Sequence, residues 1–155
     1  MTIKPNMLRF DLSQPRAGWA QATIIQHNDE LSVSASYTPI DTIRDFVDAV
    51  ASLKTASSAH CCWFQEPGEM HWQFLRSGDS IVVEIIRFAG KHAPDGATLF
   101  RAETRWVDFA AQVVASMHKM RDSLGVDGYE REWKHPFPVE ACEKLDKAVR
   151  KSEAQ

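Results

Sequence analysis

The stretch CCWFQEPGEMHWQF, residues 61–74, decides how this chain folds. It combines adjacent cysteines, two tryptophans, two glutamates and a histidine, and another histidine precedes it at position 60. The central Glu66-Pro67-Gly68-Glu69 is typical of a type II turn, because proline presets the second position and glycine accepts the positive φ of the third. The stretch therefore predicts two antiparallel strands, 59–65 and 70–76, joined by a tight turn.

The turn also predicts which side chains lie opposite one another. With Glu66 and Glu69 as its outer residues, Trp63 faces Trp72 across the hairpin. A second turn, Ser77-Gly78-Asp79-Ser80, suits a two-residue hairpin loop and sets a third strand, 81–88, beside the second. Because side chains alternate between the two faces of a strand, one face is predicted to be core. Its members are Cys61, Trp63, Met70, Trp72, Phe74, Ile81, Val83 and Ile85.

The opposite face mixes apolar and polar side chains. It holds His60, Cys62, Phe64, His71, Gln73, Leu75, Val82, Glu84, Ile86 and Phe88. A face fully in water should be more polar than this. Two interpretations stay open: helices cover part of the face, or a partner protein or a second copy of the chain covers it. The candidate binding residues are His60, Cys62, Phe64, His71, Gln73, Glu84 and Ile86.

The remaining elements follow from hydrophobic periodicity. Residues 7–12, 19–27 and 31–37 alternate and predict an antiparallel meander, followed by a helix with Asp41 as its N-cap. After the three strands already described come a loop at 89–96 and a strand at 97–104. A long helix over about 105–124 ends at Gly125, and a last helix covers about 138–151. The order βββ-α-ββββ-α-α predicts an α+β fold, with an antiparallel sheet of about six to seven strands and helices packed on it, in a single domain over 1–155.

Composition narrows the class of partner. The chain has 155 residues, a net charge of -3 and no block of like charge, so neither nucleic acid nor a membrane is expected as a partner. The first residues lack the apolar segment of a signal peptide. Three cysteines are an odd number, and neighbours on a strand point to opposite faces and do not bridge. These features predict a cytoplasmic protein with reduced thiols.

No catalytic constellation is predicted, and neither is a cofactor or a metal. The turn places Cys62 opposite Gln73 and His60 opposite Leu75, which separates His60 from His71. Spacings such as CxxC, HExxH, GxSxG and the phosphate-binding loops are absent from the sequence. Glu66 and Glu69 are expected at the tip of the turn, in water.

Tyr129 and Trp133 form the second candidate binding feature. They are four residues apart and share one face if the segment is helical. Such a pair either anchors the tail to the body of the domain or forms an exposed aromatic hot spot.

Two segments carry a resemblance. WFQEPGEMHW (63–72) and YEREWKHPFP (129–138) resemble a family of small uncharacterised bacterial proteins whose α+β build is similar to that of toxin-system immunity proteins. The resemblance implies a non-catalytic domain that binds and blocks a toxin. Two alternatives remain: a small-molecule-binding protein or enzyme with a pocket between sheet and long helix, lined by His60, His71, Gln73 and Glu84, or a homodimer.

Overall fold

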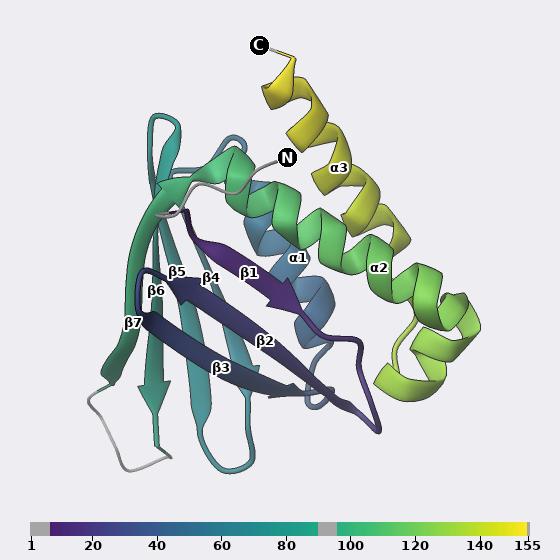
Figure 1. The fold of residues 1–155 in the computed structure, drawn as a ribbon. Coiled ribbons are helices and arrows are strands. Elements are labelled where there is room, and N and C mark those ends of the chain that lie inside the picture. The colour runs from purple at the N-terminus through teal and green to yellow at the C-terminus, as the bar shows by residue number, and fades with distance from the viewer. Residues whose placement is uncertain (1–6, 90–95, 155) are drawn as a thin grey trace.

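The computed structural model describes residues 7–89 and 96–154 of the chain, and it has the predicted α+β class and order of elements (Figure 1). The predicted loop at 89–96 falls largely on residues outside the described ranges. The elements are β1 (Arg9–Leu12), β2 (Trp19–Gln26), β3 (Asp29–Ser36), α1 (Thr42–Ser52), β4 (Ser58–Phe64), β5 (Glu69–Ser77), β6 (Ser80–Phe88), β7 (Ala97–Arg105), α2 (Trp106–Trp133) and α3 (Val139–Glu153).

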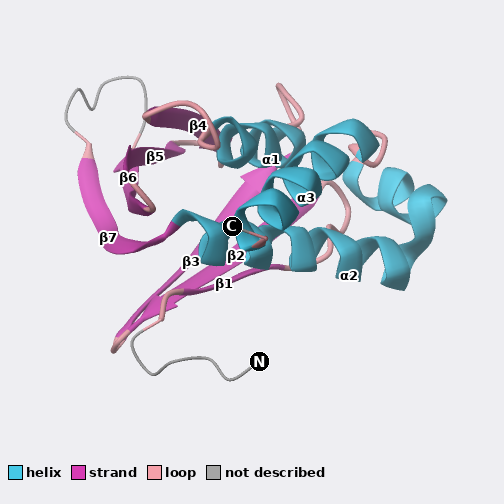
Figure 2. Ribbon diagram, turned by 90° about the horizontal axis from the view of Figure 1, so that it is seen from above, coloured by secondary structure: helices cyan, strands magenta, loops and turns pink. Residues whose placement is uncertain are grey.

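The strands are divided between two antiparallel sheets. β1, β2 and β3 form the predicted meander, and β4 to β7 form a four-stranded sheet in sequence order. α1 connects the two sheets, and the three-stranded sheet crosses the other at an angle (Figure 1). Seen from above, all three helices lie on one side of the four-stranded sheet (Figure 2). That sheet therefore has an inner face and an outer face.

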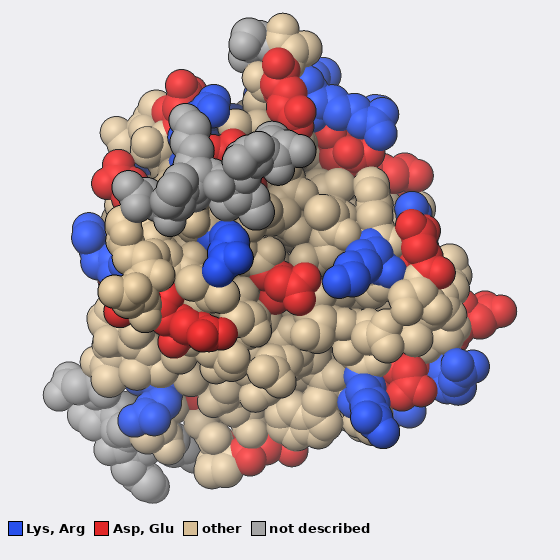
Figure 3. Space-filling view, viewed as in Figure 1, with Lys and Arg blue, Asp and Glu red and all other residues tan. Residues whose placement is uncertain are grey.

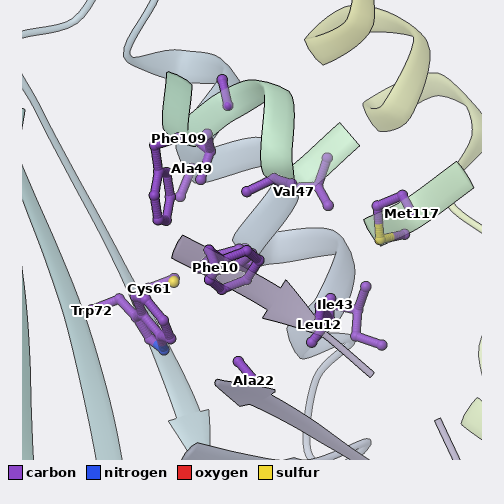
Figure 4. Packing of buried hydrophobic residues seen from close by; sticks show 14 of the residues in the cluster. Phe10, Leu12, Ala22, Ile43, Val47, Ala49, Cys61, Trp72, Phe109 and Met117 are labelled. Atoms are coloured by element: carbon purple, nitrogen blue, oxygen red, sulfur yellow. The ribbon is translucent and has the colours of Figure 1, made fainter. Parts of the chain in front are cut away.

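The inner face is the core that the alternation predicts. Each of the predicted core-face residues, from Cys61 to Ile85, is 7% exposed or less. Phe46 of α1 packs against the rings of both Trp63 and Trp72, at centroid distances of 5.4 and 4.9 Å. Phe10 of β1 and Phe109 of α2 join the same cluster (Figure 4). One apolar core thus connects both sheets with the first two helices.

The open edge of β1 is closed by polar side chains of α2. The Gln112 Oε1 atom accepts the Phe10 backbone N–H at 2.7 Å, and its Nε2 donates to the Leu8 carbonyl at 2.9 Å. One helical turn later, the Ser116 hydroxyl accepts the Leu12 N–H at 3.1 Å. Unpaired strand edges are templates for aggregation, so these contacts both protect β1 and fix the helix against it.

The helix ends agree with the sequence signals, with one addition. The Asp41 carboxylate caps α1 by accepting the Arg44 backbone N–H. Helical geometry breaks at Gly125, as predicted, where φ is 72°. The chain then resumes a helical path as far as Trp133, so Tyr129 and Trp133 do lie on a helical segment. α3 packs against α1 and α2 through Ala141, Cys142, Leu145 and Val149.

Substitution of Trp133 tests how the segment 129–138 is held against the N-terminus of α1. Its indole N–H donates to the Asp41 carboxylate at 2.8 Å, whereas the buried Trp63 N–H has no partner among the described residues. Both side chains are fully buried, so Trp133→Phe and Trp63→Phe remove similar volume. Because a hydrogen bond to a charged group contributes about 1.5–3 kcal/mol, Trp133→Phe should lower the free energy of unfolding by about 2 kcal/mol more than Trp63→Phe. Urea denaturation of both variants measures this difference, and equal losses would contradict it.

Candidate functional site

The outer face of β4 to β7 is the surface on which the sequence placed its candidate binding residues. Of the residues predicted for this face, His60, Gln73 and Leu75 are exposed and the others are half-buried. Since the helices lie on the inner side, the interpretation in which helices cover this face is wrong. Cover by a partner protein or a second copy stays a prediction.

The predicted register of β4 against β5 is wrong by two residues. Phe64 pairs with Glu69, so the connecting loop contains the four residues from Gln65 to Gly68 instead of two. The loop has a cis Glu66–Pro67 bond and a positive φ at both Glu66 and Gly68, a backbone path that a type II turn does not have. At Gly68 a β-carbon would also lie 3.2 Å from the Phe88 carbonyl oxygen. A shift of two preserves the faces but changes every cross-strand neighbour.

The corrected register brings together histidines that the sequence interpretation separated. Cys62 lies opposite His71, and His60 lies opposite Gln73. The His60 Nε2 and His71 Nδ1 atoms are 2.8 Å apart, and the ring centroids are separated by 4.9 Å. The predicted separation of His60 from His71, which spoke against a metal site, is therefore wrong.

Four side chains of the outer face form one connected group, which we call the Cys–His cluster: His60, Cys62, Glu69 and His71. The Glu69 Oε2 atom lies 2.7 Å from His71 Nε2 and accepts the Cys62 thiol at 3.4 Å. The Cys62 sulfur and His71 Nε2 are 3.7 Å apart. The Phe88 ring packs against His71 with a centroid distance of 4.5 Å and holds the imidazole in place.

The electrostatics of the cluster keep its thiol protonated. Burial, and then the hydrogen bond to Glu69, raise the pKa of Cys62 to about 12. Hydrogen bonds from His71 and Cys62 lower the pKa of Glu69, and burial followed by the nearby His71 lowers the pKa of His60. A protonated thiol is a poor nucleophile, so without a bound cation the cluster is unsuited to cysteine catalysis. Thiol, imidazole and carboxylate together are instead a donor set for a transition metal.

The other predicted residues lie on the same face without forming a pocket with the long helix. Glu84 pairs with Arg101 of β7 at 3.4 Å, and Gln73 is their neighbour on β5. Ile86 contacts the chain near Gly96, where a β-carbon would come within 2.4 Å of its side chain. α2 packs on the other side of the sheet, so the predicted pocket between sheet and long helix is not lined by His60, His71, Gln73 and Glu84.

Tyr129 and Trp133 belong to the core and do not form an exposed hot spot. Both are fully buried, and Tyr129 packs edge-on against Phe137 at 5.0 Å. Burial raises the pKa of Tyr129 above its ordinary value. Of the two predicted roles, the anchoring one describes this pair.

Sequence reasoning missed Glu69 and Arg101 as members of the outer face. Glu69 was placed at the tip of the turn, yet it lies in β5, two residues before His71 and on the same face. The spacing of Glu69 and His71 was a usable signal, because residues two apart on a strand share a face. Arg101 is recognised only through its pairing with Glu84 across β6 and β7.

Comparison with protein-family models, curated proteins and solved structures finds no match for this chain. None of the helices in residues 7–89 and 96–154 combines the length and apolarity needed to cross a membrane. On the side of the molecule seen in Figure 3, acidic and basic side chains are interspersed. The function therefore has to be inferred from the surface itself.

Alkylation of Cys62 tests the electrostatics of the cluster. With a pKa of about 12, only about one thiol in 10⁴ is ionised at pH 8, so iodoacetamide should react slowly. Glu69→Gln removes the carboxylate charge that opposes ionisation, so the pKa should fall and the rate should rise about tenfold per pKa unit. Peptide mass spectrometry of chelator-treated protein measures the rate at Cys62. Glu66→Gln, in the adjacent loop, is the control, and an unchanged rate in Glu69→Gln would contradict the expectation.

Proposed function

We propose that this chain is a non-catalytic, cytoplasmic protein-binding domain that docks through the outer face of β4 to β7, with a second copy of the same chain as its partner. The observation that carries the proposal is Leu75, which is 58% exposed on that face and lies beside the half-buried Val82. An exposed apolar side chain with an apolar neighbour, on a sheet face that no helix covers, is typical of an interface. The immunity-type role implied by the resemblance stays a prediction.

The pattern of side chains supports a second copy as the occupant. Glu84 and Arg101 of the outer face pair with each other, and the exposed Glu103 of β7 lies opposite Val82. A two-fold axis along the strands, between β5 and β6, would set Leu75 of one copy against Val82 of the other. The same axis would set Gln73 against Glu84, an amide that can donate to a carboxylate. The face is therefore complementary to itself, as an isologous dimer requires.

The size of the face predicts a weak dimer. Four strands about 4.8 Å apart, with about 3.3 Å per residue, give a flat area of about 500 Å². A stable interface buries about 800 Å² per partner, so this one belongs among the transient contacts. The chain near Gly96 also covers part of the Ile86 end, which leaves the end at Leu75 and Val82 most open. We expect a dissociation constant of about 0.1–1 mM, so that a solution at about 10 μM is largely monomeric.

Sedimentation and light scattering over about 10 μM to about 1 mM test the proposal. The average mass should rise from monomer towards dimer with concentration. Leu75→Asp should abolish the rise, because it places a charge in the apolar pair that the second copy would cover. Val126→Asp is the matched control: Val126 is 50% exposed on α2, away from the outer face, and this variant should associate like the wild type.

Three outcomes would overturn the second copy as the partner. They are a monomer over the whole concentration range, a Leu75→Asp variant that associates normally, and a Val126→Asp variant that does not associate. Circular dichroism of each variant establishes that it folds, which exposed positions such as these should permit.

A further inference from the structure

We propose that Cys62, Glu69 and His71 form a binding site for a divalent transition-metal ion of the Zn²⁺ type, with His60 as the outer partner of His71. This site goes beyond the proposed docking role and does not depend on it. The observation is geometric: one donor atom from each of the three residues lies within 4.8 Å of the other two. The three ligand types, thiolate, imidazole and carboxylate, are those that Zn²⁺ accepts in proteins.

The distances between the donor atoms fit tetrahedral coordination. With Zn–S at about 2.3 Å and Zn–N or Zn–O at about 2.0–2.1 Å, tetrahedral angles separate sulfur from nitrogen or oxygen by about 3.5 Å and nitrogen from oxygen by about 3.3 Å. The Cys62 sulfur lies 3.7 Å from His71 Nε2 and 3.4 Å from Glu69 Oε2, so both sulfur distances fit as they stand. The 2.7 Å between nitrogen and oxygen has to lengthen by about 0.6 Å.

Glu69 is the side chain that can make this adjustment. It is 43% exposed, whereas His71 is 21% exposed and packed against Phe88. A small rotation of the carboxylate opens the triangle without moving the strands. Cys62 and His71 are held more firmly, because they lie directly opposite each other in the β4–β5 ladder. Two ligands on paired strands and one adjustable ligand make a pre-organised site.

His60 supplies the outer hydrogen bond that a metal-bound histidine requires. A ligand nitrogen must offer its lone pair, so a cation on His71 Nε2 leaves the ring proton on Nδ1. That proton points at His60 Nε2, 2.8 Å away, which accepts it. Outer partners of this kind fix the ring orientation and the tautomer. Since Cys62 binds as a thiolate, each ion bound releases the thiol proton to solvent.

The fourth coordination position faces away from the core. The Cys–His cluster lies on the outer face, so water can complete the tetrahedron. This arrangement of three protein ligands and one open position differs from a closed structural zinc site.

Titration of the reduced, chelator-treated full chain with Co²⁺ tests the site. Co²⁺ replaces Zn²⁺ in tetrahedral sites, and a thiolate ligand gives it a charge-transfer band in the near ultraviolet along with visible d–d bands. We expect one Co²⁺ per chain, both kinds of band, and loss of the bands when Zn²⁺ is added. The protein is kept at about 10 μM, below the concentration of the proposed dimer. Binding by a monomer would uphold this site even if the docking proposal failed.

Variants distinguish specific Co²⁺ binding by Cys62, Glu69 and His71 from nonspecific binding elsewhere on the surface. Cys62→Ser should abolish the charge-transfer band, and Glu69→Gln and His71→Gln should weaken Co²⁺ binding more than His60→Ala does. His60→Ala should keep the band and lose about 10–100-fold in affinity, as expected for an outer partner. Cys142→Ala and His118→Ala are the matched controls, because both residues lie outside the cluster.

The melting temperature, measured with and without Zn²⁺, distinguishes loss of the metal site from misfolding of a variant. Zn²⁺ should raise the melting temperature of the wild type and of both controls, because a ligand that binds only the folded state stabilises it, but it should not raise that of Cys62→Ser. Absence of the Co²⁺ bands in the wild type would overturn the proposal. A charge-transfer band that persists in Cys62→Ser, or is lost in Cys142→Ala, would overturn it as well.

Discussion

The packing of one ring, Phe46, is the constraint on which the rest of the structure depends. It touches Phe10 from the three-stranded sheet, Trp63 and Trp72 from the four-stranded sheet, and Phe109 from α2. The two sheets share no hydrogen-bonded ladder among the described residues, so apolar packing around this ring joins them. Two side-chain hydrogen bonds add to it, from Gln65 to the Ser34 carbonyl and from Gln26 to the Glu103 carbonyl. Aromatic clusters of this kind contribute through buried area and through preferred ring geometry.

This packing also determines where chemistry can occur. Because side chains alternate along β4 and β5, burial of Trp63 and Trp72 forces Cys62 and His71 to the outer face. A firmly packed inner face holds the strands still, so the outer donors keep fixed separations. The proposed docking centre at Leu75 lies four residues along β5 from His71, which is about 13 Å. The two proposed activities of the face therefore occupy different ends of it.

The two hairpins show when turn residues predict the loop length and the strand register, and when they do not. The Ser77–Ser80 connection is the two-residue loop that the sequence predicts, and it sets the third strand beside the second as expected, with Trp72 opposite Ile85. The connection through Pro67 has four residues, and its register differs by two. A proline-glycine pair is compatible with more than one loop length, and the choice depends on contacts such as that of Gly68 with β6. Because the register differs by an even number of residues, each side chain stays on its predicted face, and the predicted core face is confirmed.

The sequence by itself determined the elements, their order and the division of side chains between two faces, because periodicity, capping and alternation act over a few residues. Only the tertiary structure decided which face the helices cover, since both faces of the central hairpin are partly apolar. It also decided that His60 lies beside His71, that Glu69 lies within reach of Cys62, and that Trp133 is buried. These facts depend on a loop path and on packing between distant segments, and local pattern does not encode either one.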